Sequence, residues 1–299
     1  MSNIIPIDLF FQNHFEIIAA YLIPYPGGAV LVESGPGATL ANLLAGLREH
    51  GVEPKTITHV LLTHIHLDHA GAAGWFAAQG ARVYVHPLGL PHLVNPERLL
   101  ASARLVYGDR LETLWGKFWP VPQANLVEVA DGVDFEIGKL HITALHTPGH
   151  ASHHIAYLFE DTCFSGDVGG IRMPKTRYIR LPYVLPETDL VKWRESLHCL
   201  LQAGTGQIAP THFGMFENAS AHLTRALQQL DELEGWLEAT MADDPPIEVL
   251  RSRYLSWLLG RERDLGISNG VQAAYELAAP AHLSADGLFR YWHKVRMAS

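Results

Sequence analysis

The chain has 299 residues, 48% of them hydrophobic, so it can bury the core of one large domain, with or without an appendage. Its formal net charge of −9 argues against a general nucleic-acid binder, which would present a basic surface. No apolar run approaches the roughly 20 residues that span a bilayer, and the first residues lack the features of a secretory signal. We therefore expect a cytoplasmic protein with neither nucleic acid nor a membrane as partner. The two cysteines, Cys163 and Cys199, lie in apolar surroundings and are expected to be free and buried.

Strands alternate with helices through the first third of the chain. Apolar segments between polar or Pro-Gly breaks predict strands at residues 4–10, 16–24, 28–33, 60–62 and 82–86. An amphipathic helix is predicted from the leucines that share one face, Leu40, Leu43, Leu44 and Leu47. A second helix is expected over the small-residue segment 70–78. This alternation is typical of an α/β layered fold.

The pattern changes between residues 87 and 122, where a helical insertion is expected. Its aromatic end, at Trp115, Phe118 and Trp119, is assigned to the core. Strands then return at residues 126–129, 133–137, 139–145, 154–159, 162–165 and 206–209. Residues 168–187 are rich in Gly, Pro, Arg and Tyr without periodicity, which predicts a long loop, and Thr188-Asp189 then caps a helix to about residue 203.

The rest of the chain is predicted to be helical. The expected helices cover residues 217–242, 246–259, 270–279 and 284–297. We therefore divide the chain into an α/β domain, residues 1–216, and a C-terminal helical domain, residues 217–299.

Four candidate metal ligands follow the buried strand at 60–62. They are His64, His66, Asp68 and His69, within six positions. Alternate residues of an extended chain point the same way, so His64 and His66 can converge on one ion. Asp68 and His69 fall where the chain turns into a helix and can face a second ion. Imidazole and carboxylate together suit zinc, and also iron or manganese.

Three further candidates lie far along the chain, each in a turn after a strand. His150 ends the segment Thr-Pro-Gly-His, where Pro148-Gly149 forces a sharp turn. Asp167 ends Ser-Gly-Asp, where Gly166 permits a close backbone approach. His212 lies in Pro-Thr-His-Phe-Gly.

In this order the motifs H-x-H-x-D-H, T-P-G-H, S-G-D and a late His resemble the metallo-β-lactamase superfamily, over roughly residues 15–215. The resemblance implies a four-layer αββα sandwich with two metal ions at one edge. It assigns His64, His66 and His150 to the first ion and Asp68, His69 and His212 to the second, with Asp167 bridging them. Glu33 stands where many members have an Asp that supports the ligands.

The resemblance implies a metal-dependent hydrolase of the glyoxalase-II-like branch. We expect two divalent ions, most simply zinc, to share a hydroxide that attacks a small ester-like substrate, a thioester or a lactone. Asp68 would also act in catalysis by orienting the hydroxide and carrying its proton. The segment after Asp167 lacks the Cys-Gly-Arg element of hydroxyacylglutathione hydrolases, which argues against glutathione specificity.

Other functions remain open at this point. Persulfide dioxygenases have a similar motif set but use a single iron, which would make the protein an oxidoreductase. A phosphodiesterase or nuclease is a further alternative, although no inserted nuclease domain is evident and the charge is unfavourable. A flavodiiron protein would need a flavin domain, and none follows the metal motifs.

The loop after Asp167 carries the candidates for substrate binding, Arg172, Tyr178 and Arg180. In an otherwise acidic protein these cations could attract an anionic small-molecule substrate. The alternative is a solvated basic loop. The sequence does not name the substrate or the native metal, and it leaves a homodimer open.

Overall fold

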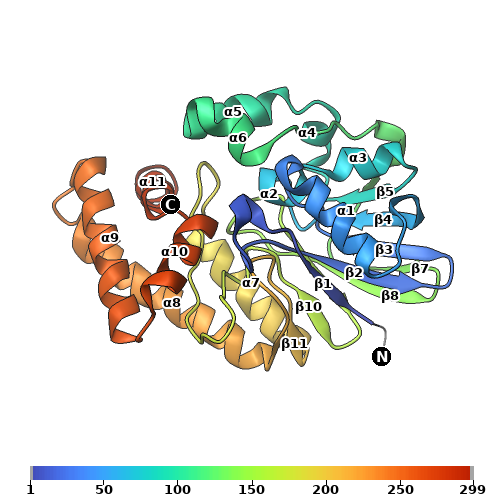
Figure 1. Ribbon diagram of the computed structural model, residues 1–299. Helices are drawn as coiled ribbons and strands as arrows, with labels where there is room; N and C mark the ends of the chain where they lie inside the picture. The colour runs from blue at the N-terminus through green and yellow to red at the C-terminus, as the bar shows by residue number, and fades with distance from the viewer. Residues whose placement is uncertain (1–2, 297–299) are drawn as a thin grey trace.

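Two six-stranded sheets pack face to face, and helices cover both outer sides (Figure 1). The computed structural model describes residues 3–296. An apolar cluster from the inner faces of both sheets, including Tyr21, Val32, Ile142 and Tyr157, fills the space between them. The αββα sandwich predicted from the sequence is therefore confirmed.

The first sheet contains the N-terminal strands in chain order. They are β1 (Ile5–Asp8), β2 (Ala19–Tyr25), β3 (Gly28–Val32), β4 (Ile57–Leu61), β5 (Arg82–Val85) and β6 (Leu126–Glu128). Strands β1 to β3 are antiparallel, whereas β3 to β6 run parallel. Helices α1 (Leu40–Glu49), α2 (Leu67–Ala70) and α3 (Ala73–Ala78) belong to this half, and α1 buries Leu40, Leu43 and Leu47 on the predicted face.

The insertion consists of three short helices that lie above α3 in Figure 1. They are α4 (Leu90–Val94), α5 (Glu97–Tyr107) and α6 (Leu111–Trp115). Phe118 is buried, and the half-buried Trp115 stacks on Phe11 with ring centroids 5.2 Å apart. The aromatic end of the insertion thus packs against the core, as predicted.

The second sheet has the order β12-β11-β10-β9-β8-β7. Its strands are β7 (Val133–Ile137), β8 (Leu140–His146), β9 (Ile155–Phe159), β10 (Thr162–Phe164), β11 (Gln207–Ile208) and β12 (Phe216–Glu217). Since β9 is antiparallel to both β8 and β10, and β10 is parallel to β11, strands β8, β10 and β11 all point the same way.

The carboxyl ends of β3, β4, β8, β10 and β11 meet at one edge of the sandwich. Backbone hydrogen bonds join the two halves there, from Ala19 N to Thr211 O (2.9 Å) and from Ile155 N to Thr63 O (2.7 Å). Each candidate ligand follows one of these strands, so the topology alone brings distant parts of the chain to the same edge.

The C-terminal helices pack on the outer face of the second sheet through α7 (Leu190–Ala203). They are α8 (Ala219–Met241), α9 (Ile247–Asp264), α10 (Asn269–Ala278) and α11 (Ala281–Lys294). Asp189 caps α7 by accepting from Val191 N and Lys192 N, as predicted. One apolar cluster runs from the sheet through α7 into α8, α9 and α11. The division at residue 216 remains a prediction, because the two parts share this core.

Several element boundaries differ from the prediction. The first strand ends at Asp8 and the second begins only at Ala19, because Phe10, Gln12, Asn13 and Glu16 adopt left-handed backbone conformations incompatible with a strand. The helix expected over 70–78 is divided into α2 and α3, and α2 already contains Asp68 and His69.

Two of the predicted C-terminal helices, 246–259 and 284–297, also start or end elsewhere. Helix α9 continues to Asp264, and α11 begins at Ala281, directly after Pro280. Residue 297, its predicted end, lies outside the described residues. Both cysteines are free, but only Cys163 is buried and Cys199 is half-buried. Within residues 3–296, no helix has both the length and the apolar character needed to cross a membrane.

Candidate metal centre

Three imidazoles form the first part of the cluster. His64 Nε2 lies 2.9 Å from His66 Nδ1, which in turn lies 3.0 Å from His150 Nε2. His64 and His150 are buried and His66 is partly exposed. The three ligand atoms therefore face one point, as expected from the alternate positions of His64 and His66 and the turn before His150.

The second part of the cluster combines Asp68, His69 and His212. Asp68 Oδ2 lies 3.5 Å from His69 Nε2 and 3.4 Å from His212 Nε2. Asp167 joins the two parts, because its Oδ2 lies 3.3 Å from His150 Nε2 while its Oδ1 lies 3.4 Å from His69 Nε2. All seven predicted residues thus meet at the edge of the sandwich.

The arrangement fits cations. In a tetrahedral site with bonds of about 2.0–2.1 Å, neighbouring ligand atoms are roughly 3.3 Å apart, close to the 2.9–3.5 Å separations given above. His69 Nε2 and Asp167 Oδ1 are buried and have no hydrogen-bond partner among the described residues. Buried polar atoms are rarely left unpaired, so atoms that converge in this way indicate a missing positive partner.

The outer nitrogen of most of these imidazoles is held by an acceptor. His150 Nδ1 donates to Pro182 O (2.9 Å), His212 Nδ1 to Ile17 O (2.8 Å), and His69 Nδ1 to Glu33 Oε1 (3.1 Å). Each bond fixes the tautomer that leaves the Nε2 lone pair facing the cluster. His66 differs, since it offers Nδ1.

Glu33 connects three segments behind the cluster. Besides His69, its Oε1 accepts from the hydroxyls of Thr63 and Thr211, the latter at 3.1 Å. The side chain is fully buried, and Glu33 has a φ of +65°, which is unusual for a non-glycine residue. The residue that the sequence placed behind the ligands therefore touches one of them directly.

Two glycines allow the ligand turns to form. Gly149 has a φ of +139°, and a Cβ there would lie 2.3 Å from the Cα of Trp193 on α7. A Cβ on Gly166 would lie 2.6 Å from His154 Nε2 and from Thr63 Oγ1. The close backbone approach predicted at Gly166 is therefore present.

Electrostatics divide the cluster into neutral and charged groups. Burial, reinforced by neighbouring imidazoles, holds the pKa of His64 well below its usual value and lowers the pKa of His66 to about 3. Burial alone would raise the pKa of Asp68, but His69 and His212 hold it well below the usual range. Burial opposes protonation of His69, yet Asp68, Asp167 and Glu33 raise its pKa well above normal. The cluster thus offers ionised carboxylates and, at His64 and His66, neutral imidazole lone pairs, the forms that bind metals. The pKa of His212 is also raised, by Asp167 and Asp68 against the effect of burial, so His69 and His212 would each release a proton when a cation binds.

Comparison with known proteins agrees with this geometry. The family model described as metallo-beta-lactamase superfamily matches residues 15–212. The chain belongs to the metallo-beta-lactamase superfamily. Superfamily members typically bind divalent metals, and the groups His64-His66-His150, His64-His69-Asp167 and Asp68-His69-His212 are each compact enough to hold one. Metal binding by the seven residues, and catalysis by Asp68, remain a proposal.

Curated relatives match parts of the chain. A metallo-beta-lactamase fold-containing protein of Sulfurisphaera tokodaii is 27% identical over 67% of this chain and 74% of its own length. The atrochrysone carboxyl ACP thioesterase of Aspergillus fumigatus is 30% identical, over 52% of this chain and 41% of that protein. A hydroxyacylglutathione hydrolase of Shewanella halifaxensis is 26% identical, over 56% of this chain and 51% of that protein. The chain is an enzyme of this superfamily and spans about half the length of the latter two relatives.

Solved structures share the fold. A metallo-beta-lactamase family protein of Thermus thermophilus superimposes with a TM-score of 0.71 at 23% identity, covering 98% of this chain and 93% of that one. The archaeal superfamily protein from Sulfolobus tokodaii gives 0.59 at 22% identity, covering 77% and 86%. The first match extends over the C-terminal helices, so the superfamily fold with a helical extension is shared by both chains.

The proposed substrate-binding residues have protein partners in the structure. Arg172 Nε donates to Thr176 O (3.0 Å), and its guanidinium lies 4.1 Å from the ring centroid of Phe216. Tyr178 is buried and packs on Tyr275. Arg180 is only 4% exposed and pairs with carboxylates of the C-terminal helices. Most residues of this loop are buried, although Lys175 and Arg177 are exposed, so the loop matches the solvated basic loop considered as the alternative only in part. Substrate binding by these three residues stays a prediction.

Other residues near the superfamily site had no distinctive sequence signal. His153 Nε2 lies 3.8 Å from Glu187, and its ring centroid is 5.6 Å from that of His66. Burial raises the pKa of Tyr107, on the insertion, and the charge of Asp68 adds to this rise. Glu187 lies in a loop and Tyr107 in a helix, and neither segment contains a metal-binding motif. Their proximity to the cluster therefore follows from the fold and could not be predicted from the sequence.

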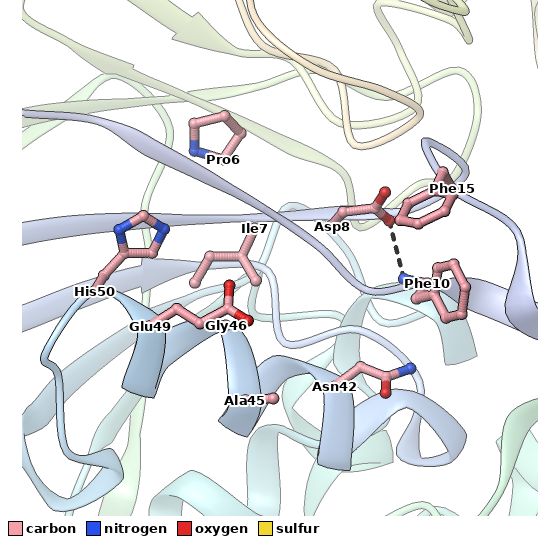
Figure 2. A pocket seen from close by; sticks show the side chains of 10 residues that line it. All are labelled: Pro6, Ile7, Asp8, Phe10, Phe15, Asn42, Ala45, Gly46, Glu49 and His50. Carbon is pink, nitrogen blue, oxygen red and sulfur yellow. Dashed lines mark hydrogen bonds between the residues drawn. The ribbon is translucent and has the colours of Figure 1, made fainter.

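A separate hollow of about 360 Å³ lies between β1 and α1. Figure 2 shows its lining, which includes Asp8, Phe10, Phe15 and Asn42, with Asp8 accepting from Phe10 N. None of the seven clustered residues borders it. The hollow therefore has no part in the chemistry of the cluster.

Proposed function

We propose that this protein is a metal-dependent hydrolase that cleaves a small acyl compound, a thioester or a lactone, with two divalent cations. The observation that carries the proposal is the division of the seven side chains into two groups that share Asp167. The names of the thioesterase and hydroxyacylglutathione hydrolase relatives support acyl transfer to water as the reaction. Because both matches cover about half of those proteins, they support the reaction class rather than a particular substrate.

The donor set favours zinc, with iron or manganese as alternatives. His64, His66 and His150 would hold the first cation, and Asp68, His69 and His212 the second, with Asp167 between them. When bound, such cations lower the pKa of a shared water to about 7 and polarise the substrate carbonyl. Three imidazole ligands suit zinc, whereas a carboxylate-richer second site also suits iron and manganese.

Asp68 is the residue assigned to proton transfer. Its side chain is 17% exposed, whereas those of His69, His212 and Asp167 are 0%, 2% and 6% exposed. Together with the partly exposed His66, it marks the side from which substrate and water reach the cluster. Its low pKa keeps the carboxylate ionised, so it can accept a hydrogen bond from the attacking water and orient it.

The remaining ligands act as a rigid frame. Hydrogen bonds from His69, His150 and His212 to fixed acceptors allow little rotation of their rings. A frame held in this way keeps the attacking water and the carbonyl in a constant relative orientation, which is the main contribution that positioning makes to rate.

Purification without added metal, followed by elemental analysis and a turnover screen with thioesters, lactones and phosphodiesters, tests the proposal. We expect close to two divalent ions per chain and turnover of a thioester or lactone that disappears after chelation and returns with zinc. Turnover unaffected by complete metal removal would disprove the mechanism. One iron per chain, with oxygen consumption in the presence of a persulfide, would instead identify a dioxygenase.

A further inference from the structure

The loop over residues 168–187, here called the ligand loop, contacts both groups of the metal centre through its backbone. Arg172 N donates to His212 O (2.7 Å), and Pro182 O accepts from His150 Nδ1 (2.9 Å). The two arms of the loop are joined by a reciprocal backbone pair between Ile171 and Arg180, at 2.8 and 3.0 Å. A shift of either arm would therefore displace a proposed ligand.

The C-terminal helices hold this loop through a buried cation. The guanidinium of Arg180 pairs with Glu262 of α9, and it also donates to Glu276 Oε2 (3.3 Å) and Ala279 O (3.1 Å). Arg180 is 4% exposed and Glu262 is fully buried. Arg180 lies two residues before Pro182, the residue whose carbonyl fixes His150.

A second contact comes from Tyr275 of α10. Its hydroxyl accepts from Met173 N (3.1 Å), donates to Tyr178 O (2.8 Å) and lies 3.0 Å from Thr176 Oγ1. Tyr275 is completely buried. The C-terminal helices thus contact both arms of the ligand loop through directional hydrogen bonds and an ion pair, and not only through apolar packing.

A buried ion pair of this kind is poorly explained by stability alone. Desolvation of the two charges offsets most of their attraction, and apolar residues of similar volume often stabilise a protein as well. Arg180 Nε and Glu262 Oε2 also lack hydrogen-bond partners in the part of the chain that the structure describes. What the pair does provide is a fixed position for the backbone at residue 180, because three acceptors hold the planar guanidinium through its two terminal nitrogens.

We propose that the pair between Arg180 and Glu262, with the Tyr275 hydroxyl, forms a brace through which the C-terminal helices set the orientation of His150 and His212. Arg180 is then a positioning residue for the metal centre rather than a substrate ligand. The inference rests on the proposed function in one respect, that the seven clustered side chains bind metal. It makes metal affinity depend on helices that contribute no ligand to the cluster.

Cobalt(II) titration of the full-length protein, followed by visible absorption, tests the brace without any substrate. Arg180→Met removes the buried cation and keeps most of the side-chain length. We expect cobalt to bind at least tenfold more weakly, with altered absorption bands, since loss of groups that orient metal ligands typically weakens binding by 10–100-fold. Tyr275→Phe, which loses only the hydroxyl, should weaken binding to a smaller extent.

Leu258→Ala is the matched control. Leu258 is a buried residue of α9, one turn before Glu262, and it packs in the apolar core without a hydrogen bond to the ligand loop. The control should unfold at a lower denaturant concentration yet bind cobalt like the unaltered protein, with the same spectrum. Equal weakening by Leu258→Ala and Arg180→Met would overturn the brace, because both would then act only through general destabilisation.

Further outcomes separate the brace from the proposed function. Cobalt affinity and bands unchanged in Arg180→Met overturn the brace and leave the metal centre intact. An unaltered protein that binds neither cobalt nor zinc overturns the metal centre itself. If Arg180→Met does not fold, the double variant Arg180→Met/Glu262→Leu removes both charges and replaces it. We expect the double variant to fold and to bind cobalt more weakly than the unaltered protein. Cobalt affinity equal to that of the unaltered protein would contradict the brace.

Discussion

Glu33 Oε1 lies 3.1 Å from His69 Nδ1, and both side chains are fully buried. The same oxygen also accepts from the hydroxyls of Thr63 and Thr211, so one carboxylate connects β3, the segment after β4 and the segment after β11. Its charge stabilises an imidazole whose other nitrogen faces the proposed second cation. The orientation of His69 is therefore set by a residue that is not itself a ligand.

Replacement of Glu33 by alanine should weaken binding of the second cation more than binding of the first. Without the acceptor, His69 loses its fixed tautomer, and we expect zinc affinity at that site to fall by about 10–100-fold. Competition with a chromophoric chelator measures this, and the stoichiometry at limiting zinc should approach one ion per chain. The exposed Glu53→Ala is the control and should keep both sites. Equal affinities in the two variants would show that Glu33 has no influence on the centre.

Asp68→Asn tests the assignment of proton transfer. The amide keeps the shape of the side chain but cannot accept a proton, so kcat should fall by about 10²–10⁴-fold with little change in KM. Steady-state kinetics on the substrate found in the screen measures both constants. His141→Ala, whose side chain is 77% exposed, should leave them unchanged. A variant with near-normal kcat would exclude Asp68 as the group that handles the proton.

Much of the metal centre could be predicted because its candidate ligands lie in short sequence motifs. The spacing of His64 and His66 indicated convergence on one ion, and Pro148-Gly149 indicated a sharp turn before His150. The alternation of strands and helices then indicated the layered fold. These inferences succeed because local backbone geometry determines where such side chains point.

The partners of the ligand loop could not be predicted in the same way. From the sequence, Arg180 is predicted to bind substrate because the loop that contains it is rich in basic residues. The fold instead brings Glu262 and Glu276 to it from 82 and 96 positions away. The early end of the first strand is equally hidden, since the residue types of Phe10 and Gln12 do not indicate left-handed conformations. In the structure Asp8 accepts from Phe10 N (2.9 Å) and Glu16 N (2.7 Å) within this segment. Long-range packing determines the first feature, and side-chain to backbone hydrogen bonds of Asp8 accompany the second.

Removal of metal should lower the stability of the whole protein. Asp68 and Asp167 are mostly buried and, within residues 3–296, pair only with imidazoles, so the cations would be their main compensation. A ligand that binds only the folded state stabilises it by about 4 kcal/mol at a concentration 1,000-fold above Kd. Calorimetry should show a lower Tm after dialysis against chelator, restored by zinc. An identical Tm with and without metal would mean that the cluster binds cations weakly or not at all.

Stability should also fall in mild acid because of His222 on α8. This side chain is 1% exposed, its Nε2 donates to Gly169 O (2.8 Å), and burial lowers its pKa to about 4. The unfolded chain, with an ordinary pKa of about 6.5, binds a proton first, so the contribution of neutral His222 is complete above that pH and declines as the pH falls toward 4. At pH 5 the loss should be about 2 kcal/mol.

The variant His222→Gln isolates this contribution, because glutamine can donate to the same carbonyl but does not titrate. Denaturant unfolding of metal-free protein at pH 7 and pH 5 gives the difference in unfolding free energy for each variant. That difference should be about 2 kcal/mol smaller in His222→Gln than in the unaltered chain. His198→Gln, at an exposed position of α7, should leave it unchanged. If His222→Gln loses as much stability between the two pH values as the unaltered protein, other groups cause the acid sensitivity.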